Sequence, residues 1–117
     1  MFRHSTLTQM AITQKYAKAN VAQSQTDEPL VGAVTGKKIR VLAAFFMAGG
    51  TATTLVFNTK GAGAGVAISC EFANGANQPG SLQFCPVGWF ETAAGEALTV
   101  TTGAGSTTGI QVVYEEV

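Results

Sequence analysis

Apolar and polar residues alternate with a period of two along most of the chain, and glycine-rich stretches interrupt the alternation. Alternation with this period is typical of β-strands that bury one face. No segment shows the period of a helix, and the pattern predicts about eight short strands, at residues 17–23, 29–34, 37–48, 51–58, 64–72, 81–86, 97–102 and 109–116. Short strands at regular spacing, separated by Gly, Asn and Pro turns, indicate an all-β sandwich or barrel.

Residues 37–48 form the strongest predicted strand. Both of its faces are apolar: one would carry Ile39, Val41, Ala43, Phe45 and Met47, and the other Leu42, Ala44 and Phe46. A strand with two apolar faces is typically covered on both sides. The Gly49-Gly50 pair that follows predicts a two-residue hairpin to the strand at 51–58.

The two cysteines bear on the register of the strands at 64–72 and 81–86, which flank a predicted loop at 74–80. In the first of these strands the alternation points four side chains inward: Val66, Ile68, Cys70 and Phe72. A hairpin register that pairs Cys70 with Cys85 would put Leu82 and Phe84 on the opposite face, and a one-residue slip exposes a whole apolar set. We therefore expect Cys70 to be buried, Cys85 to lie on the other face, and both thiols to be free.

The composition indicates a domain that is surrounded by other protein. The chain has 117 residues, which indicates one domain. Only 12% of the residues are charged, 7 basic and 7 acidic, whereas 46% are hydrophobic. Because few charges keep copies apart, we infer that other subunits cover much of the surface. A net charge of zero argues against a nucleic-acid partner, and the basic cluster of Lys37, Lys38 and Arg40 is better explained by a solvated edge or by ion pairs to another subunit.

Signals for membrane insertion or export are weak. The longest apolar run, residues 41–48, is far shorter than the roughly 20 residues that a membrane helix needs. The first residues, MFRHS, do not lead into an apolar signal-peptide core, because Gln9, Gln14 and Lys15 interrupt it. Two cysteines are also few for a small secreted domain. We therefore expect no membrane partner, and assembly in a cytoplasm.

Residues suited to catalysis or metal binding are sparse. His4 is the only histidine, so neither a catalytic triad, a Cys-His pair nor a histidine metal site can form within one chain unless the N-terminal segment folds back. Glu91 and Glu96 could be the paired carboxylates of a glycoside hydrolase, but solvated turn acids are the more common case. The glycine-rich residues 61–65 and 103–109 lack the Lys-Ser/Thr ending of a phosphate loop. The sequence thus predicts no enzyme, cofactor, metal site or small-molecule substrate.

Residues 86–98, PVGWFETAAGEAL, hold the only tryptophan and the densest turn chemistry. One interpretation is a corner, in which Trp89 and Phe90 seal one end of the fold and the indole N–H binds a carbonyl. The other is a subunit contact, where large aromatic residues are enriched. The corner interpretation is favoured, although one residue can belong both to a corner and to a subunit contact. The candidates for core or subunit contact are Phe45, Phe46, Trp89 and Phe90.

Three segments carry a resemblance to a known group: VTGKKIRVL (residues 34–42), PVGWFETAAGEAL (86–98) and VVYEEV (112–117). Over residues 17–117 the chain resembles small all-β virion proteins of tailed bacteriophages, most specifically in the second segment. The resemblance implies a single-domain antiparallel β-sandwich of jelly-roll type that self-associates on the particle, and it implies no catalytic residues. Residues 1–16 lie outside the match, and their apolar residues follow no regular period. We therefore expect an extended N-terminal arm there and a sandwich domain at 17–117.

These features predict a head decoration or cement protein that binds the capsid exterior as a homotrimer, with itself and the major capsid protein as partners. The alternative is a receptor-binding or adhesion module of a phage tail or fibre. The arm would reach along the shell or a sister copy, and an arm of this kind can add a strand to a sheet edge. Its candidate capsid contacts are Phe2, Arg3, Leu7, Met10, Ile12 and Tyr16.

Overall fold

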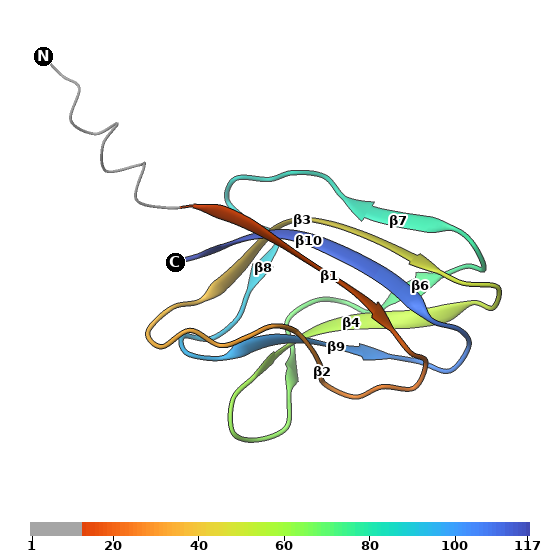
Figure 1. Cartoon of the computed structure of the whole chain (residues 1–117), viewed down its shortest axis with the longest axis horizontal. Coiled ribbons are helices and arrows are strands. Elements are labelled where there is room, and N and C mark those ends of the chain that lie inside the picture. The colour runs from red at the N-terminus through yellow and green to blue at the C-terminus, as the bar shows by residue number, and fades with distance from the viewer. Residues whose placement is uncertain (1–12) are drawn as a thin grey trace, which may run out of the picture.

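The structure is a computed structural model that describes residues 13–117, and it is built of strands alone over that range. The strands are β1 (Gln14–Val21), β2 (Glu28–Val31), β3 (Ile39–Ala48), β4 (Thr53–Lys60), β5 (Val66–Ala67), β6 (Phe72–Asn74), β7 (Pro79–Leu82), β8 (Phe90–Glu91), β9 (Ala97–Thr102) and β10 (Thr108–Glu116). They form two antiparallel sheets that pack face to face (Figure 1). The predicted all-β sandwich is confirmed.

The strand order is that of a jelly roll. One sheet has the order β1-β10-β3-β7, with β8 also paired to β3; the other has the order β2-β9-β4-β5, with β6 also paired to β4. When β5 with β6, and β7 with β8, are each taken as one broken strand, eight strands remain, four in each sheet. Every connection then crosses between the sheets except the one from β4 to β5, as in jelly rolls.

The core lies between the sheets and is centred on aromatic rings. The Phe57 ring centroid lies 5.0 Å from that of Phe90, and the Phe46 centroid lies 5.0 Å from that of Phe72. Phe57 meets Phe72 edge to face at 6.2 Å, a favourable geometry for aromatic pairs. The fully buried aliphatic side chains of the same cluster are Val21, Ile39, Val41, Leu55, Leu98, Val100 and Val112.

A β-bulge at Leu42 changes which side chains of β3 face the core. In the pairing of β10 with β3, Tyr114 lies opposite Val41 and Val113 lies opposite Ala43, so Leu42 has no partner. An extra residue of this kind reverses the alternation of the strand beyond it. The inward side chains are therefore Ile39, Val41, Leu42, Ala44, Phe46 and Ala48. The predicted grouping of Val41 with Phe45 and Met47 on one face is wrong, because it assumed an unbroken alternation.

The Gly49-Gly50 pair does not close a hairpin. β3 and β4 belong to different sheets, so the connection between them crosses the sandwich (Figure 1). The Gly49 amide donates to the carbonyl of Thr107, 3.0 Å away, instead of to a partner across a hairpin. The predicted hairpin is therefore wrong, although the chain does turn at this position.

The segment around Cys70 departs from a regular strand. The Phe57 amide donates to the Ser69 hydroxyl at 2.9 Å, where a regular ladder would supply a carbonyl, and β5 ends two residues earlier at Ala67. Ile68 and Phe72 still pack against the core, but Cys70 and Val66 are exposed. The predicted burial of Cys70 is therefore wrong.

Both cysteines are free, as expected. The register argument behind that expectation does not apply, because the two segments that carry the cysteines are not partners. β6 pairs with β4 in one sheet, whereas β7 pairs with β3 in the other.

The sandwich begins earlier in the chain than predicted. β1 starts at Gln14 and pairs with β10 along its whole length, from Gln14 opposite Glu115 to Val21 opposite Thr108. The last three residues assigned to the arm, residues 14–16, are thus part of a sheet, and the boundary at residue 16 is corrected accordingly. Five of the arm's candidate contact residues lie outside the described residues: Phe2, Arg3, Leu7, Met10 and Ile12.

Candidate interaction surface

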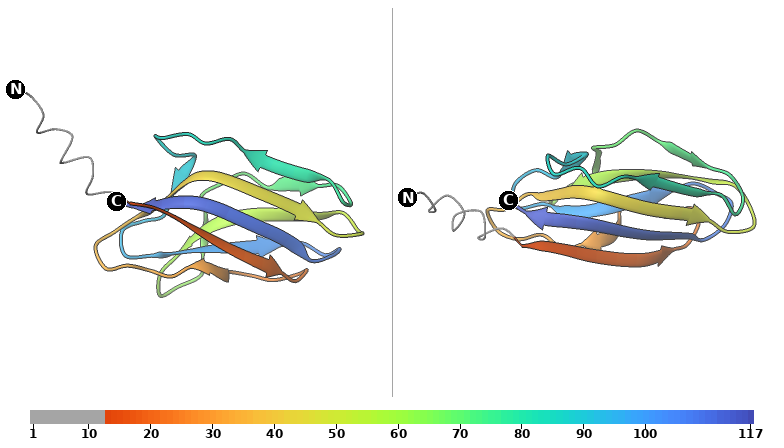
Figure 2. Two further views of the ribbon diagram at one scale, coloured as in Figure 1. Left: turned by 45° about the horizontal axis from the view of Figure 1, so that its top comes forward. Right: turned by 90° about the horizontal axis from the view of Figure 1, so that it is seen from above.

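The outer surface of the sheet β1-β10-β3-β7 is built from rows of side chains that face away from the core. Residues directly opposite one another in an antiparallel ladder point to the same side of the sheet. The registers give one charged outward row, Gln14, Glu115, Arg40 and Glu91. They also give three rows with few charges: Asn20, Gly109, Met47 and Pro79; Lys18, Gln111, Phe45 and Ser81; and Tyr16, Val113 and Ala43. We name the three rows with few charges the β10 face; its four strands lie side by side in the right-hand view of Figure 2.

The β10 face exposes large apolar side chains. Tyr16 is 79% exposed, Phe45 45% and Met47 37%. Two shallow depressions, of about 470 and 300 Å³, lie along the face and share Phe45 and Gln111 in their linings. Gly109 lines the larger one between Asn20 and Met47, and the missing side chain deepens the surface there. Since Tyr16, Phe45 and Met47 are exposed, no other part of residues 13–117 covers them.

The outer surface of the second sheet is polar and satisfied by its own chain. The Asn58 side-chain amide donates to the Thr101 hydroxyl at 2.8 Å, and the Thr99 hydroxyl donates to Asp27 at 3.3 Å. The other oxygen of Asp27 accepts from the Gly65 amide at 3.0 Å, which ties the β4–β5 connection to this surface. Asn58 and Thr99 are consequently buried. A depression of about 420 Å³ lies on this surface, and its lining includes Asp27, Lys60 and Thr99. The two outer surfaces thus differ in chemistry: one carries polar side chains that bond within the chain, and the other presents apolar side chains.

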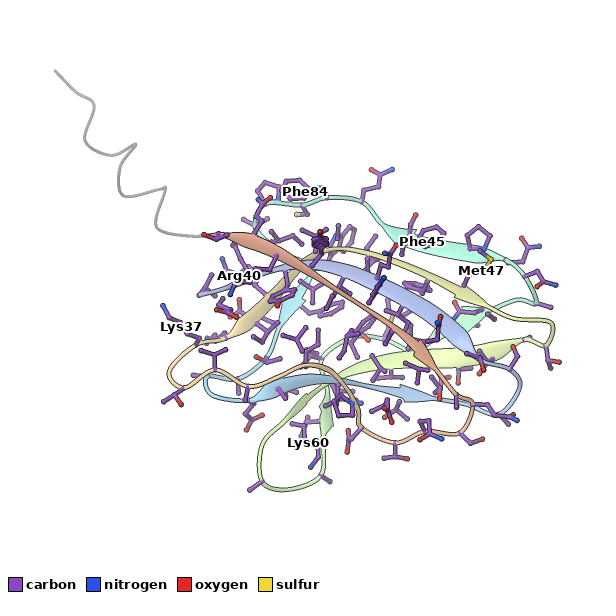
Figure 3. The ribbon with its side chains drawn as sticks, viewed as in Figure 1. Lys37, Arg40, Phe45, Met47, Lys60 and Phe84 are labelled. Carbon is purple, nitrogen blue, oxygen red and sulfur yellow. The ribbon has the colours of Figure 1, made fainter. Side chains whose placement is uncertain are left out.

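The connection between β7 and β8 presents a second apolar cluster. In residues 83–89, which we name the 83–89 loop, Phe84 is 53% exposed, Val87 79% and Trp89 48%. The indole Nε1 of Trp89 donates to the Gln83 carbonyl at 2.7 Å, so the predicted hydrogen bond to a carbonyl is confirmed. Figure 3 places Phe84 at the margin of the molecule and Phe45 and Met47 on the sheet.

Hydrogen bonds to β3 hold the 83–89 loop in place. The Cys85 amide donates to the Leu42 carbonyl at 2.9 Å, and the Trp89 amide donates to the Val41 carbonyl at 2.8 Å. Between them Gly88 has a φ of 86°, a conformation that other residues rarely adopt. The loop is thus attached to the sheet near both of its ends.

A charged cluster borders the β10 face at the end where β8 pairs with β3. Arg40 Nε lies 2.9 Å from Glu91 Oε1, Lys38 Nζ lies 3.2 Å from Glu91 Oε2, and Arg40 Nη1 lies 3.7 Å from Glu115 Oε1. The hydrogen bond from Arg40 lowers the pKa of Glu91, against the opposing effect of partial burial. Two of the three basic residues are thus paired within their own chain, so they need no carboxylate from another subunit.

The described residues offer little for catalysis. Glu91 is held by two cations, and Glu96 accepts a hydrogen bond from the Thr59 hydroxyl at 2.7 Å. Within residues 13–117 there is no group of three His, Cys, Asp or Glu side chains that could hold a metal ion. Over the same range no helix is long and apolar enough to span a bilayer.

No family model matches. No curated protein matches either. One solved structure that aligns with it is the cryo-EM structure of the giant freshwater prawn Macrobrachium rosenbergii extra small virus (XSV) VLP, at 10% identity and a TM-score of 0.42, over 90% of this chain and 77% of that one. So low a score carries no inference about what the chain does.

The predicted contact residues fall into two groups. Phe46 is 3% exposed and Phe90 packs on Phe57, so both belong to the core. Phe45 lies on the β10 face and Trp89 in the 83–89 loop, and both are open to a partner. Tyr16 lies on the β10 face within β1.

On the β10 face and in the 83–89 loop, three exposed apolar residues were not named as contact candidates from the sequence: Met47, Phe84 and Val87. Met47 stands two residues after Phe45 and shares its face, so the alternation carried this information. Phe84 and Val87 flank the tryptophan motif, but no periodicity marks a loop residue as exposed.

Proposed function

We propose that the chain is a virion structural protein, and specifically a head decoration or cement protein that binds the capsid exterior of a bacteriophage as a trimer. The observation that carries the proposal is the contrast between the two outer surfaces. On one, polar side chains form hydrogen bonds within the chain, whereas the β10 face leaves Tyr16, Phe45 and Met47 in water. Exposed apolar patches of this kind mark interaction sites. The resemblance in residues 86–98 supports the phage assignment.

The mechanism is association alone. Apolar side chains on the sandwich bury themselves against sister copies, and the segment before β1 extends to the major capsid protein. Many modest contacts repeated around a symmetric shell stabilise it through multivalency, with no single strong site. Assembly would take place in the host cytoplasm, and the mature protein would lie on the capsid surface.

The copy number in purified virions tests the proposal. A decoration protein occurs in hundreds of copies on each particle, and quantitative gel analysis against the major capsid protein measures this ratio directly. A few copies per particle would instead indicate the tail or fibre receptor-binding module. Absence from the particles would contradict both.

Deletion of residues 2–12 tests the arm. We expect the truncated chain to keep its far-UV circular dichroism and to lose co-sedimentation with capsids. The deletion must stop before Gln14, because β1 pairs with β10 from that residue onward. Unchanged occupancy on capsids would overturn the role of the arm and leave the copy-number test unaffected.

A further inference from the structure

We propose that the 83–89 loop of one copy docks on the β10 face of a second copy, and that this contact, repeated head to tail, closes the trimer. The inference rests on the proposed self-association and adds the two surfaces that meet. Phe84, Val87 and Trp89 are the docking side chains, and Tyr16, Phe45 and Met47 line the receiving face.

The two surfaces have complementary shapes. The loop stands at the margin of the sheet and carries Phe84 there (Figure 3), whereas the β10 face is hollowed by depressions of about 470 and 300 Å³. The larger depression lies beside Phe45 and is deepened at Gly109. A protruding aromatic cluster and an apolar hollow are what a packed interface requires of its two sides.

The position of the two surfaces allows a head-to-tail assembly. The β10 face extends to β1, which is one edge of the sheet, and the 83–89 loop joins the two strands, β7 and β8, that pair along the other side of β3. A contact between two different patches on identical chains is heterologous, and it forms a ring when the rotation closes. A trimer built on this contact uses both patches of every copy.

Charge argues against the alternative in which two β10 faces pack on each other. Lys18 is exposed in the middle row, and the three rows contain no carboxylate. The nearest acidic groups in the ladder, Glu115 and Glu91, are already paired with Arg40. A face-to-face contact would therefore remove two Lys18 ammonium groups from water without a partner, which is unfavourable. The 83–89 loop contains no charged residue, so a contact with the loop covers a single Lys18 and does not bring two like charges together.

The apolar area is sufficient for a specific contact. Since a buried aromatic side chain removes roughly 150–250 Å² from water, the six partly exposed side chains offer roughly 600 Å² together. Specific interfaces bury about 1,200–2,000 Å² in total, of which a polar rim supplies a large share. The loop is also held by its hydrogen bonds to β3, so little ordering is needed on docking.

Complementary variants test the contact by native mass spectrometry and sedimentation of the full chain. Phe84→Ser removes the docking side, and Phe45→Glu blocks the receiving side. For each variant alone, we expect the fraction of chains in trimers to fall at least tenfold. A mixture of the two should form a one-to-one dimer. The 83–89 loop of the Phe45→Glu variant is intact and can dock on the intact β10 face of the Phe84→Ser variant. Val66→Ser, at a 64% exposed apolar residue of the other sheet, should form trimers like the wild type.

Other outcomes overturn the contact. A trimeric Phe84→Ser variant, or a mixture that stays monomeric, would exclude the loop as the docking element. Val87→Lys provides a second docking-side variant at a 79% exposed position, and circular dichroism checks that every variant is folded. A monomeric wild-type chain would also exclude the contact. Copy number on virions is measured separately, so a failed contact and a failed decoration role can be told apart.

Discussion

Gly80 illustrates at the residue scale how a missing side chain shapes the core. It lies opposite Phe46 in the pairing of β3 with β7, and a Cβ there would overlap the Phe46 ring. That ring is 3% exposed and lies against Phe57 and Phe72, so it has little room to move. We expect Gly80→Ala to lower the free energy of unfolding by about 1–3 kcal/mol, measured by urea denaturation.

Gly63→Ala is the matched control for this substitution. A Cβ at Gly63 meets nothing within 4 Å. Its free energy of unfolding should stay within about 0.5 kcal/mol of the wild type. If Gly80→Ala were equally neutral, the short strand β7 would be yielding to the ring, and the packing argument would fail.

Glu91 provides a pH-dependent contribution to stability. The hydrogen bond from Arg40 lowers its pKa in the folded state, below the value of about 4.3 in an unfolded chain. The ion pairs therefore stabilise the fold above the unfolded-state pKa, and this stabilisation is lost as the pH falls through the folded-state pKa. Because the side chain is 34% exposed, solvent weakens the effect. We expect Glu91→Gln to lose roughly 0.5–1 kcal/mol at pH 7.

Unfolding curves at neutral and acidic pH distinguish this effect from simple packing. The stability difference between Glu91→Gln and the wild type should disappear in acid, where the wild-type carboxyl is protonated as well. Glu71→Gln is a suitable control, since Glu71 is exposed and takes part in no ion pair of the described residues. A difference that persists in acid would mean that the charge of Glu91 contributes nothing.

At the scale of elements, the alternation predicted which segments are strands better than it predicted their faces. The strands at 37–48, 97–102 and 109–116 appear close to their predicted bounds as β3, β9 and β10. The bulge at Leu42 could not be foreseen, because both faces of that segment are apolar and either phase fits the pattern. The choice is made by packing against β10, which lies more than 60 residues away in the chain.

The sequence also did not show which of the two sheets each strand belongs to. Gly49-Gly50 fits a hairpin and a crossing between sheets equally well, since both need a tight reversal. The exposure of Cys70 follows from the Ser69 hydroxyl that replaces a ladder partner, a substitution that alternation does not encode. Part of the candidate surface was predicted, since Phe45, Trp89 and Tyr16 were named from the sequence. That Phe45 and Tyr16 lie on the β10 face and Trp89 in the 83–89 loop became clear only from the register of β3 and β10.

Hydrogen exchange should rank the strands by how completely they are paired. β10 pairs with both β1 and β3, and its Ile110 and Val112 side chains are buried. β5 has two exposed residues and pairs only with β4. Because local opening exposes weakly packed edges first, we expect β5 amides to exchange roughly 100-fold faster than β10 amides, or more. Equal protection would mean that the whole sandwich opens in a single step.

At the scale of the whole molecule, the asymmetry between the two outer surfaces organises the fold. A sandwich of this size has two broad faces, and here the chain uses the Asp27 turn and the β4–β5 connection to cover one of them. The remaining face has apolar side chains and one lysine, Lys18, which forms no ion pair within residues 13–117. The low charge content of the sequence is thus seen at two surfaces. The β10 face has one charged residue, and the 83–89 loop has none.

Trp89 gives this asymmetry a direct optical readout. It is the only tryptophan of the chain, it is 48% exposed, and it lies in the loop proposed to dock. Docking moves the indole out of water, so the fluorescence emission of the full-length protein should shift to shorter wavelength as concentration rises through the association range. The Phe45→Glu variant keeps the loop and lacks the receiving face, and its emission should not depend on concentration. If the wild type associates in sedimentation while its emission stays constant, Trp89 remains in water in the assembly, and the copies must meet through a surface other than the 83–89 loop.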